Sequence, residues 1–154
     1  MGRSGVYGTS ICCTECLLRV MFNLSLIEGK ILKKMLIVED DVTFLGLLSH
    51  VLRNQFEIYE ACGVNEALKL LENISVDLIC SDYNMPGGTG LELLEQLHRS
   101  GKKISFILMS GTEDSFVVHS VKFYGGTFCN KTDSDLLTTI RKKQIVNSGD
   151  WFMG

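Results

Sequence analysis

Short apolar runs, each followed by a helical pattern, are the feature that most constrains how this chain can fold. Met35–Val38, Val76–Cys80 and Ile104–Met109 are such runs. Runs of this length without regular polar alternation are typical of strands buried on both faces of a sheet. Phe56–Glu60 alternates as a half-buried strand does, and Thr127–Cys129 predicts a last short strand.

A helical spacing of apolar residues follows each predicted strand. The predicted helices cover 42–54, about 64–73, the region of Leu91 to Leu97, the region of Phe116 to Val121, and a last segment, capped by Thr132 or Asp133, that ends near Val146. Five β-α units in a row predict parallel crossovers with helices on both faces of a five-stranded sheet. A flavodoxin-like strand order 2-1-3-4-5 and a small Rossmann-like order both fit, although no GxGxxG follows the first strand and the chain has no GxxxxGK[ST] phosphate loop.

The length and the charge fit one domain with a short extension. The chain has 154 residues, the size of one domain. Its formal net charge of -3 argues against nucleic-acid binding as its main function. No window of about 18 uncharged apolar residues predicts a membrane span. Residues 1–34 carry five basic and two acidic groups, which sets them apart from the rest of the chain. We expect 1–33 to be a poorly ordered extension or a wrongly assigned start, and 34–146 to be the domain. The remaining residues, 147–154, would be a tail in which Trp151 is a docking or frayed residue.

The six cysteines do not form a recognisable framework. Cys13 and Cys16 make a CxxC, but no second pair follows at zinc-ligand spacing. Cys80 and Cys129 lie inside apolar runs, where a cysteine acts as a small buried hydrophobe. Without a disulfide framework we expect a reducing, cytoplasmic location.

Polar residues close four of the predicted strands. Glu39–Asp41 follow the first strand, Asp82 the third, Ser110 the fourth and Lys131 the fifth. Ligands of open parallel sheets bind beyond the carboxyl ends of the strands, so we expect these groups to converge. Paired carboxylates suit Mg²⁺, which prefers oxygen ligands, and an ionised Asp is a nucleophile for forming an aspartyl phosphate. The strand ends therefore predict a phosphoryl-acceptor site.

Residues from about 33 to 146 resemble the receiver domain of bacterial response regulators. The segments that carry the resemblance are Leu36–Asp41, Ser81–Gly90, Met109–Gly111 and Tyr124–Lys131. The resemblance implies the flavodoxin-like (βα)5 fold with strand order 2-1-3-4-5.

The resemblance also implies a role for each matching residue. Asp82 would be the phosphoacceptor. Glu39, Asp40, Asp82 and the backbone carbonyl of Asn84 would hold Mg²⁺. Ser110 would be the switch hydroxyl, Phe128 the aromatic that changes rotamer, and Lys131 the cation bonded to the phosphoryl group. Phosphorylation would then remodel the face formed by the fourth helix, the fifth strand and the fifth helix.

The implied protein is a stand-alone response regulator rather than a conventional enzyme, although it would catalyse its own phosphotransfer and dephosphorylation. Its partners would be a sensor histidine kinase or a histidine phosphotransfer protein, and a downstream target protein. Neither nucleic acid nor membrane would be a partner, and we expect a monomer or a weak homodimer.

One position departs from the family pattern and keeps alternatives open. Thr132 stands where the family usually has proline after the lysine, in a bond that is typically cis there. A cis bond before a non-proline residue costs about 2.5–4 kcal/mol, so we expect a trans bond with a shifted loop or a strained one. The alternatives are a phosphorylation-independent binding module, a small Mg²⁺-dependent phosphohydrolase, which Asn84 argues against because a second Asp belongs there, and a fragment of a longer regulator.

Overall fold

The apolar runs form the middle of one parallel sheet in the computed structural model, which describes residues 31–145. The sheet contains β1 (Lys33–Val38), β2 (Phe56–Ala61), β3 (Leu78–Asp82), β6 (Ser105–Ser110) and β7 (Thr127–Asn130). Their order is β2-β1-β3-β6-β7, which is 2-1-3-4-5 when the strands of this sheet are counted along the chain. The predicted flavodoxin-like order is therefore confirmed. All four pairings within the sheet are parallel.

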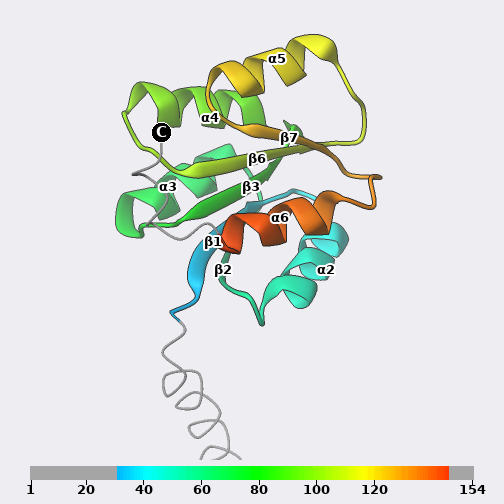
Figure 1. The fold of residues 1–154 in the computed structure, drawn as a ribbon. Coiled ribbons are helices and arrows are strands. Elements are labelled where there is room, and N and C mark those ends of the chain that lie inside the picture. Colours follow the sequence, from blue (N-terminus) through cyan, green and yellow to red (C-terminus); the bar gives the residue numbers. More distant parts are fainter. Residues whose placement is uncertain (1–30, 146–154) are drawn as a thin grey trace, which may run out of the picture. The chain divides into compact units, whose positions relative to one another are not determined.

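Helices cover both faces of the sheet (Figure 1). They are α2 (Val42–Leu52), α3 (Val64–Asn73), α4 (Gly90–Arg99), α5 (Ser115–Phe123) and α6 (Leu136–Ile145). Side chains of α2 and α6 pack in one apolar cluster, and those of α3, α4 and α5 pack in the other. Central strand residues such as Ile79 and Ile107 are fully buried between them, as residues of a two-sided sheet must be.

Three of the helices, α2, α4 and α5, begin directly after a residue whose side chain caps them. The Asp41 side chain accepts hydrogen bonds from Thr43 N and Phe44 N at the start of α2. The last helix differs from the prediction, since it begins at Leu136 rather than directly after Thr132 or Asp133. Asp133 Oδ1 accepts instead from Asp135 N in the turn that precedes the helix.

Two features of the region after β3 differ from the sequence prediction. The strand begins at Leu78 and includes Asp82, whereas the apolar run at Val76–Cys80 predicts an earlier strand. A hairpin of two-residue strands, β4 (Asn84–Met85) and β5 (Gly88–Thr89), then lies between β3 and α4, where the sequence predicts no strand. Each strand is too short to show alternation, so the sequence has no pattern that would reveal it.

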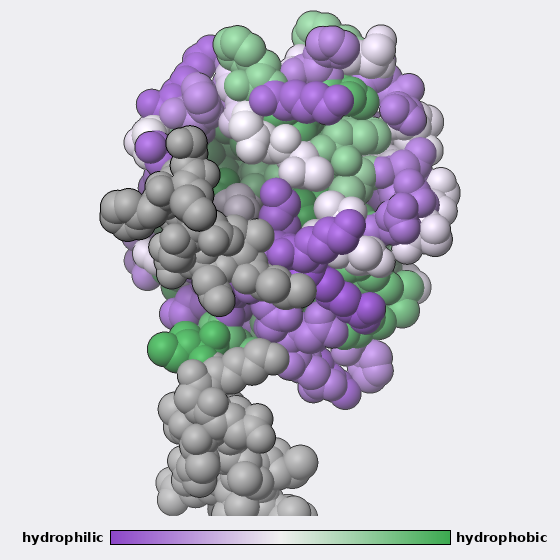
Figure 2. All heavy atoms as spheres, in the orientation of Figure 1, coloured by the Kyte–Doolittle hydropathy of each residue, from purple (hydrophilic) through white to green (hydrophobic). Residues whose placement is uncertain are grey.

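The surface seen in the same orientation is largely hydrophilic, with hydrophobic residues exposed in smaller areas (Figure 2). None of the helices within residues 31–145 has the length and apolar character needed to span a bilayer. Residues 1–30 and 146–154, which include Cys13, Cys16 and Trp151, lie outside the described part of the chain. The predicted boundaries of the extension and the tail therefore stay predictions.

Candidate functional site

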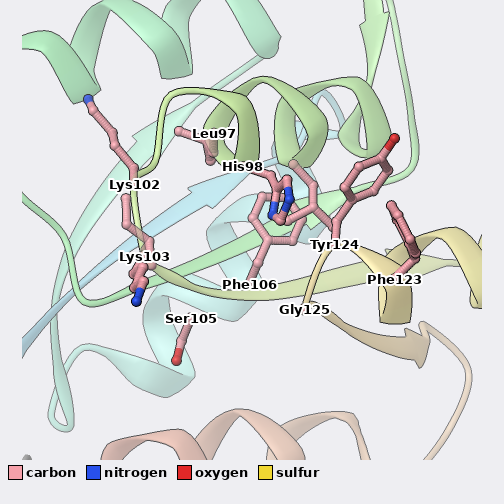
Figure 3. Close-up of a pocket in the computed structure, with 11 residues that line it drawn as sticks. Leu97, His98, Lys102, Lys103, Ser105, Phe106, Phe123, Tyr124 and Gly125 are labelled. Atoms are coloured by element: carbon pink, nitrogen blue, oxygen red, sulfur yellow. The ribbon is translucent and has the colours of Figure 1, made fainter.

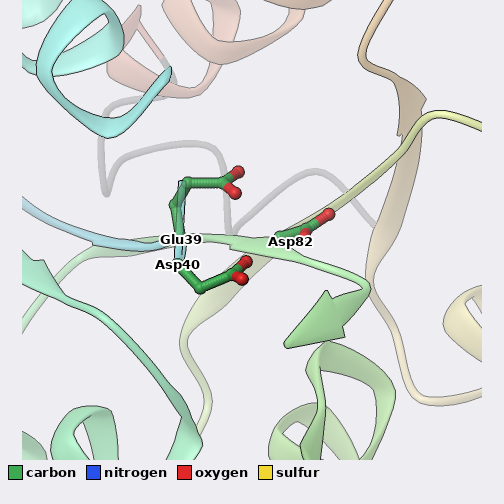
Figure 4. Close-up of side chains that lie close together, drawn as sticks. All are labelled: Glu39, Asp40 and Asp82. Carbon is green, nitrogen blue, oxygen red and sulfur yellow. The ribbon is translucent and has the colours of Figure 1, made fainter. Parts of the chain in front are cut away.

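Three carboxylates meet at the carboxyl ends of β1 and β3. One oxygen each from Glu39, Asp40 and Asp82 lies within 4.8 Å of the other two. Glu39 is 1% exposed and Asp82 is 8% exposed, while Asp40 faces solvent. Figure 4 shows Glu39 and Asp40 leaving the end of β1 beside Asp82. The parallel order places β1 next to β3, so the predicted convergence of these acids is seen in the structure.

Lys131, which directly follows the edge strand β7, forms ion pairs with two of the carboxylates. Its Nζ lies 2.7 Å from Glu39 Oε2 and 3.0 Å from Asp82 Oδ1. The same ammonium lies 4.7 Å from the centre of the Phe44 ring, in cation-π geometry. Phe44, in the first turn of α2, was not among the residues expected at the site. Its contact depends on the packing of α2 beside α6 and the loop that follows β7, for which the sequence has no local signal.

Burial and like charge make this a high-energy cluster of carboxylates. Burial raises the pKa of Glu39, and the negative charge of Asp82 adds to the rise, while the close Lys131 ammonium opposes it. Burial alone would lower the pKa of Lys131, but its ion pairs with Glu39 and Asp82 outweigh that cost and the pKa is raised. Lys131 therefore stays charged and compensates part of the negative charge.

Backbone donors fix the orientation of the carboxylates. Tyr83 N donates to Asp82 Oδ1 at 2.8 Å, and Asp41 N donates to Glu39 Oε1 at 3.2 Å. Both donors to Asp82, Tyr83 N and Lys131 Nζ, contact Oδ1. Among residues 31–145 none donates to Oδ2, so this oxygen is the one open to a reacting group.

Ser110 lies at the end of β6, between the strands that carry Asp82 and Lys131. Its neighbour Met109 pairs with Asp82 in the sheet, and Lys131 N donates to the Ser110 carbonyl at 2.8 Å. Ser110 is 4% exposed, and its Oγ accepts a hydrogen bond from Thr112 N at 3.2 Å. A serine hydroxyl that accepts one hydrogen bond can still donate its own proton.

Two further residues, Asn84 and Phe128, are predicted to take part in the site. Asn84 begins β4, two residues after Asp82, and its side chain is exposed. Phe128 is partly buried on β7 and packs against the apolar cluster of α3, α4 and α5. The roles given to the Asn84 carbonyl and to the Phe128 ring stay predictions.

The loop at Thr132 keeps Lys131 in place without a cis bond. The described residues contain no cis peptide bond, so Lys131–Thr132 is trans. Asn130 Oδ1 accepts from both the backbone N and the hydroxyl of Thr132, at 3.0 and 2.8 Å. This side-chain turn replaces the constraint that proline would impose, and the Lys131 ammonium still reaches both carboxylates.

The acidic cluster fits a divalent cation. Three carboxylates and one ammonium leave a formal charge of -2. The buried Glu39 Oε2 has no hydrogen-bond donor at a favourable angle within the described chain, although Lys131 forms an ion pair with it. Oxygen ligands around a small hard cation are the combination that Mg²⁺ prefers, so the residues present fit that ion.

Comparison with known proteins agrees with this geometry. Residues 35–140 match the response regulator receiver domain family. The transcriptional regulatory protein MalR of Bacillus subtilis is 33% identical over 123 residues, which cover 73% of this chain and 52% of MalR. The glycerol metabolism activator of Pseudomonas putida is 31% identical over 74% of this chain and 54% of its own length. The chain thus spans about half the length of these curated relatives.

Solved structures show the same fold. A CheY-like response regulator receiver domain protein from Methanospirillum hungatei superposes with a TM-score of 0.68 at 28% identity, covering 74% of this chain and 94% of that one. The response regulator protein TrrA from Thermotoga maritima, solved in complex with Mg(2+)-BeF, superposes with a TM-score of 0.64 at 27% identity, covering 74% and 100%.

Proposed function

Because the chain belongs to the response regulator receiver domain family, we propose that Asp82 accepts a phosphoryl group from a histidine kinase or a histidine phosphotransfer protein. Receiver domains are phosphoacceptor modules of two-component signalling and bind Mg²⁺ in an acidic pocket. The observation that carries the proposal is the contact at 3.0 Å between Lys131 Nζ and Asp82 Oδ1, beside two further carboxylates.

The transfer uses the free oxygen of Asp82. Its Oδ2 forms the new bond to phosphorus, and the bond from phosphorus to the donor imidazole nitrogen breaks. The imidazole keeps the electron pair of that bond. Lys131 and the Ser110 hydroxyl donate to the phosphoryl oxygens and stabilise their charge. Mg²⁺, when bound by Glu39, Asp40, Asp82 and the Asn84 carbonyl, supplies further positive charge. Water later hydrolyses the aspartyl phosphate at the same site.

Phosphorylation of Asp82 would be signalled to other proteins through the face that contains β7. Ser110 moves toward the phosphoryl group, and Phe128 turns into the space that the hydroxyl leaves. The face formed by α5, β7 and α6 changes in consequence, as a shift between two populated states. We propose that this face, carried by a domain over 34–146 that is a monomer or a weak homodimer, contacts a target protein.

The position of Lys131 favours this proposal over a phosphorylation-independent binding module. That alternative depends on Thr132, because a loop displaced by the missing proline would carry Lys131 away from the site. Instead the ammonium contacts both Glu39 and Asp82 across a trans bond.

Incubation with acetyl phosphate and Mg²⁺, followed by intact-mass measurement, tests the proposal. We expect a gain of one phosphoryl group that is lost in Asp82→Asn and when Mg²⁺ is chelated. Asp135→Asn, at an exposed position before α6, is the matched control and should retain the gain. A gain that persists in Asp82→Asn would contradict Asp82 as acceptor. No gain in folded wild-type protein that binds Mg²⁺ would support the binding module instead.

A further inference from the structure

A cavity of about 400 Å³ lies at the opposite edge of the sheet from the carboxylates. It is bounded by α4, by the start of β6 and by the end of α5 (Figure 3). Its floor is apolar, with Leu97, Ile104 and Phe106 among the lining residues. The proposed phosphorylation chemistry uses none of these residues.

Three aromatic rings form one wall of this cavity. Tyr124 packs edge-on against His98 at 5.4 Å between ring centres and against Phe123 at 5.2 Å. Phe123 is nevertheless 79% exposed, which leaves a large apolar ring in water. A wall of this kind offers the edge-to-face contacts that another aromatic side chain prefers.

One free cation lies at the rim. Lys103 is exposed and has no ion pair or hydrogen bond with any residue of the described range 31–145. Lys102 differs, because its Nζ donates to the Leu71 carbonyl at 3.0 Å and points toward α3 (Figure 3). The cavity therefore combines an aromatic wall with one available positive charge.

We propose that the segment Asp150–Met153 of this same chain docks in the cavity. Trp151 would lie against the wall of His98, Phe123 and Tyr124, and Asp150 would face Lys103. The segment reads Asp-Trp-Phe-Met and contains the only tryptophan of the protein. Aromatic residues and Met are the usual anchors of contact surfaces, and the acidic residue matches the cation at the rim.

The chain is long enough for this contact. The last turn of α6 lies at the amino-terminal edge of the sheet, because Lys33 Nζ donates to the Lys143 carbonyl at 3.0 Å. Strand register places Met35 level with Leu78, and Leu78 level with Ser105 at the cavity. Gln144 Nε2 also donates to the Gln55 carbonyl just before β2, at 2.7 Å, so the end of α6 lies beside both β1 and β2. Two to three strand spacings, about 10–15 Å, separate these strands from β6. Six residue steps from the end of α6 to Trp151 span up to about 20 Å, which is longer than this lateral distance.

A short tether also favours this occupant over a second copy. A segment held by a few residues is present at an effective concentration of about a millimolar near its site. A weak contact is then populated within one chain, whereas the same contact between chains would need protein at that concentration.

Fluorescence of Trp151 in the full chain tests the proposal directly, because no other tryptophan contributes. We expect a blue-shifted emission maximum and reduced quenching by acrylamide. Phe123→Ala should raise the quenching constant about twofold or more, as follows when an aromatic anchor is lost. Phe116→Ala is the matched control, because Phe116 is also on α5 and 73% exposed but does not line the cavity.

A second pair of variants tests the charge. Lys103→Glu should also raise the quenching constant, while Lys69→Glu, at an exposed position on α3, should not. Four outcomes would overturn the proposal: quenching in wild type equal to that of free tryptophan amide, equal effects of the two phenylalanine variants, equal effects of the two lysine variants, or a blue shift that disappears on dilution and so indicates a second copy.

Discussion

Lys131 is the residue on which the charge balance of the acidic cluster depends. It contacts Glu39 and Asp82 at once, and Glu39 is almost completely buried. A buried carboxylate without compensation costs free energy, because it loses its hydration and gains no partner. The same lysine that we propose for the phosphoryl group is therefore needed for stability in the unmodified protein.

Replacing Lys131 by alanine tests this dual role. We expect Lys131→Ala to lower the free energy of unfolding at neutral pH by about 1–3 kcal/mol, because Glu39 and Asp82 are left without their cation. Lys69→Ala removes an exposed lysine of α3 and should change stability by less than about 0.5 kcal/mol. Urea unfolding of the two variants measures both values. Equal losses would show that the ion pairs contribute nothing to folding.

The start of helix α4 packs closely against β3, the strand that carries Asp82. Thr89 and Glu92 form a capping box there, and Gly90 is packed directly against β3. A Cβ at Gly90 would lie 2.2 Å from the Asp82 carbonyl and 2.7 Å from Ser81 Oγ. A Cβ atom does not tolerate non-bonded contacts this short, so only glycine lets α4 approach the strand that carries Asp82.

A pair of glycine substitutions on two helices tests this close approach. Gly90→Ala should lower the free energy of unfolding by about 2–3 kcal/mol, since the strand or the helix must shift to admit the methyl group. Gly46→Ala, within α2, meets nothing within 4 Å and should raise stability by up to about 1 kcal/mol. Thermal unfolding of both variants gives the comparison. If both variants were destabilised by a similar amount, the cause would be the loss of glycine itself and not the close packing at Gly90.

The elements explain which parts of the site could be predicted from the sequence. Apolar runs locate the strands, and the parallel order brings their polar ends together, so Glu39, Asp82 and Lys131 are predicted to meet before any distance is known. Contacts made by the backbone or by packing have no such signal. The Tyr83 N–H on Asp82 and the Phe44 ring under Lys131 depend on the exact path of the chain.

At the scale of the whole molecule, the two edges of the sheet have different chemistry. The carboxyl edge gathers buried charge, where the fold tolerates repulsion between acids. The amino edge has an aromatic cavity with the exposed Lys103 at its rim. Both edges belong to the same central strands, since β6 begins at Ser105 beside the cavity and ends at Ser110 beside the acids.

If the acidic cluster binds Mg²⁺, as we propose, the stability of the domain should depend on that ion. At a Mg²⁺ concentration ten times the dissociation constant, a ligand that binds only the folded state stabilises it by about 1.4 kcal/mol. For a domain of this size the midpoint of thermal unfolding should rise by about 4–8 °C. Asp40→Asn should abolish most of the rise at little cost to folding, because Asp40 is exposed and lacks the ion pair of its neighbours.

Two controls separate metal binding from general screening of charge. Glu72→Gln removes an exposed carboxylate from α3, far from the cluster in sequence, and should leave the Mg²⁺ response intact. Sodium chloride at matched ionic strength screens the acids without coordinating them, so it should stabilise the wild type much less than Mg²⁺ does. If sodium chloride gave the same rise, or if Glu72→Gln lost as much as Asp40→Asn, the three carboxylates would act as a charged surface and not as a metal site.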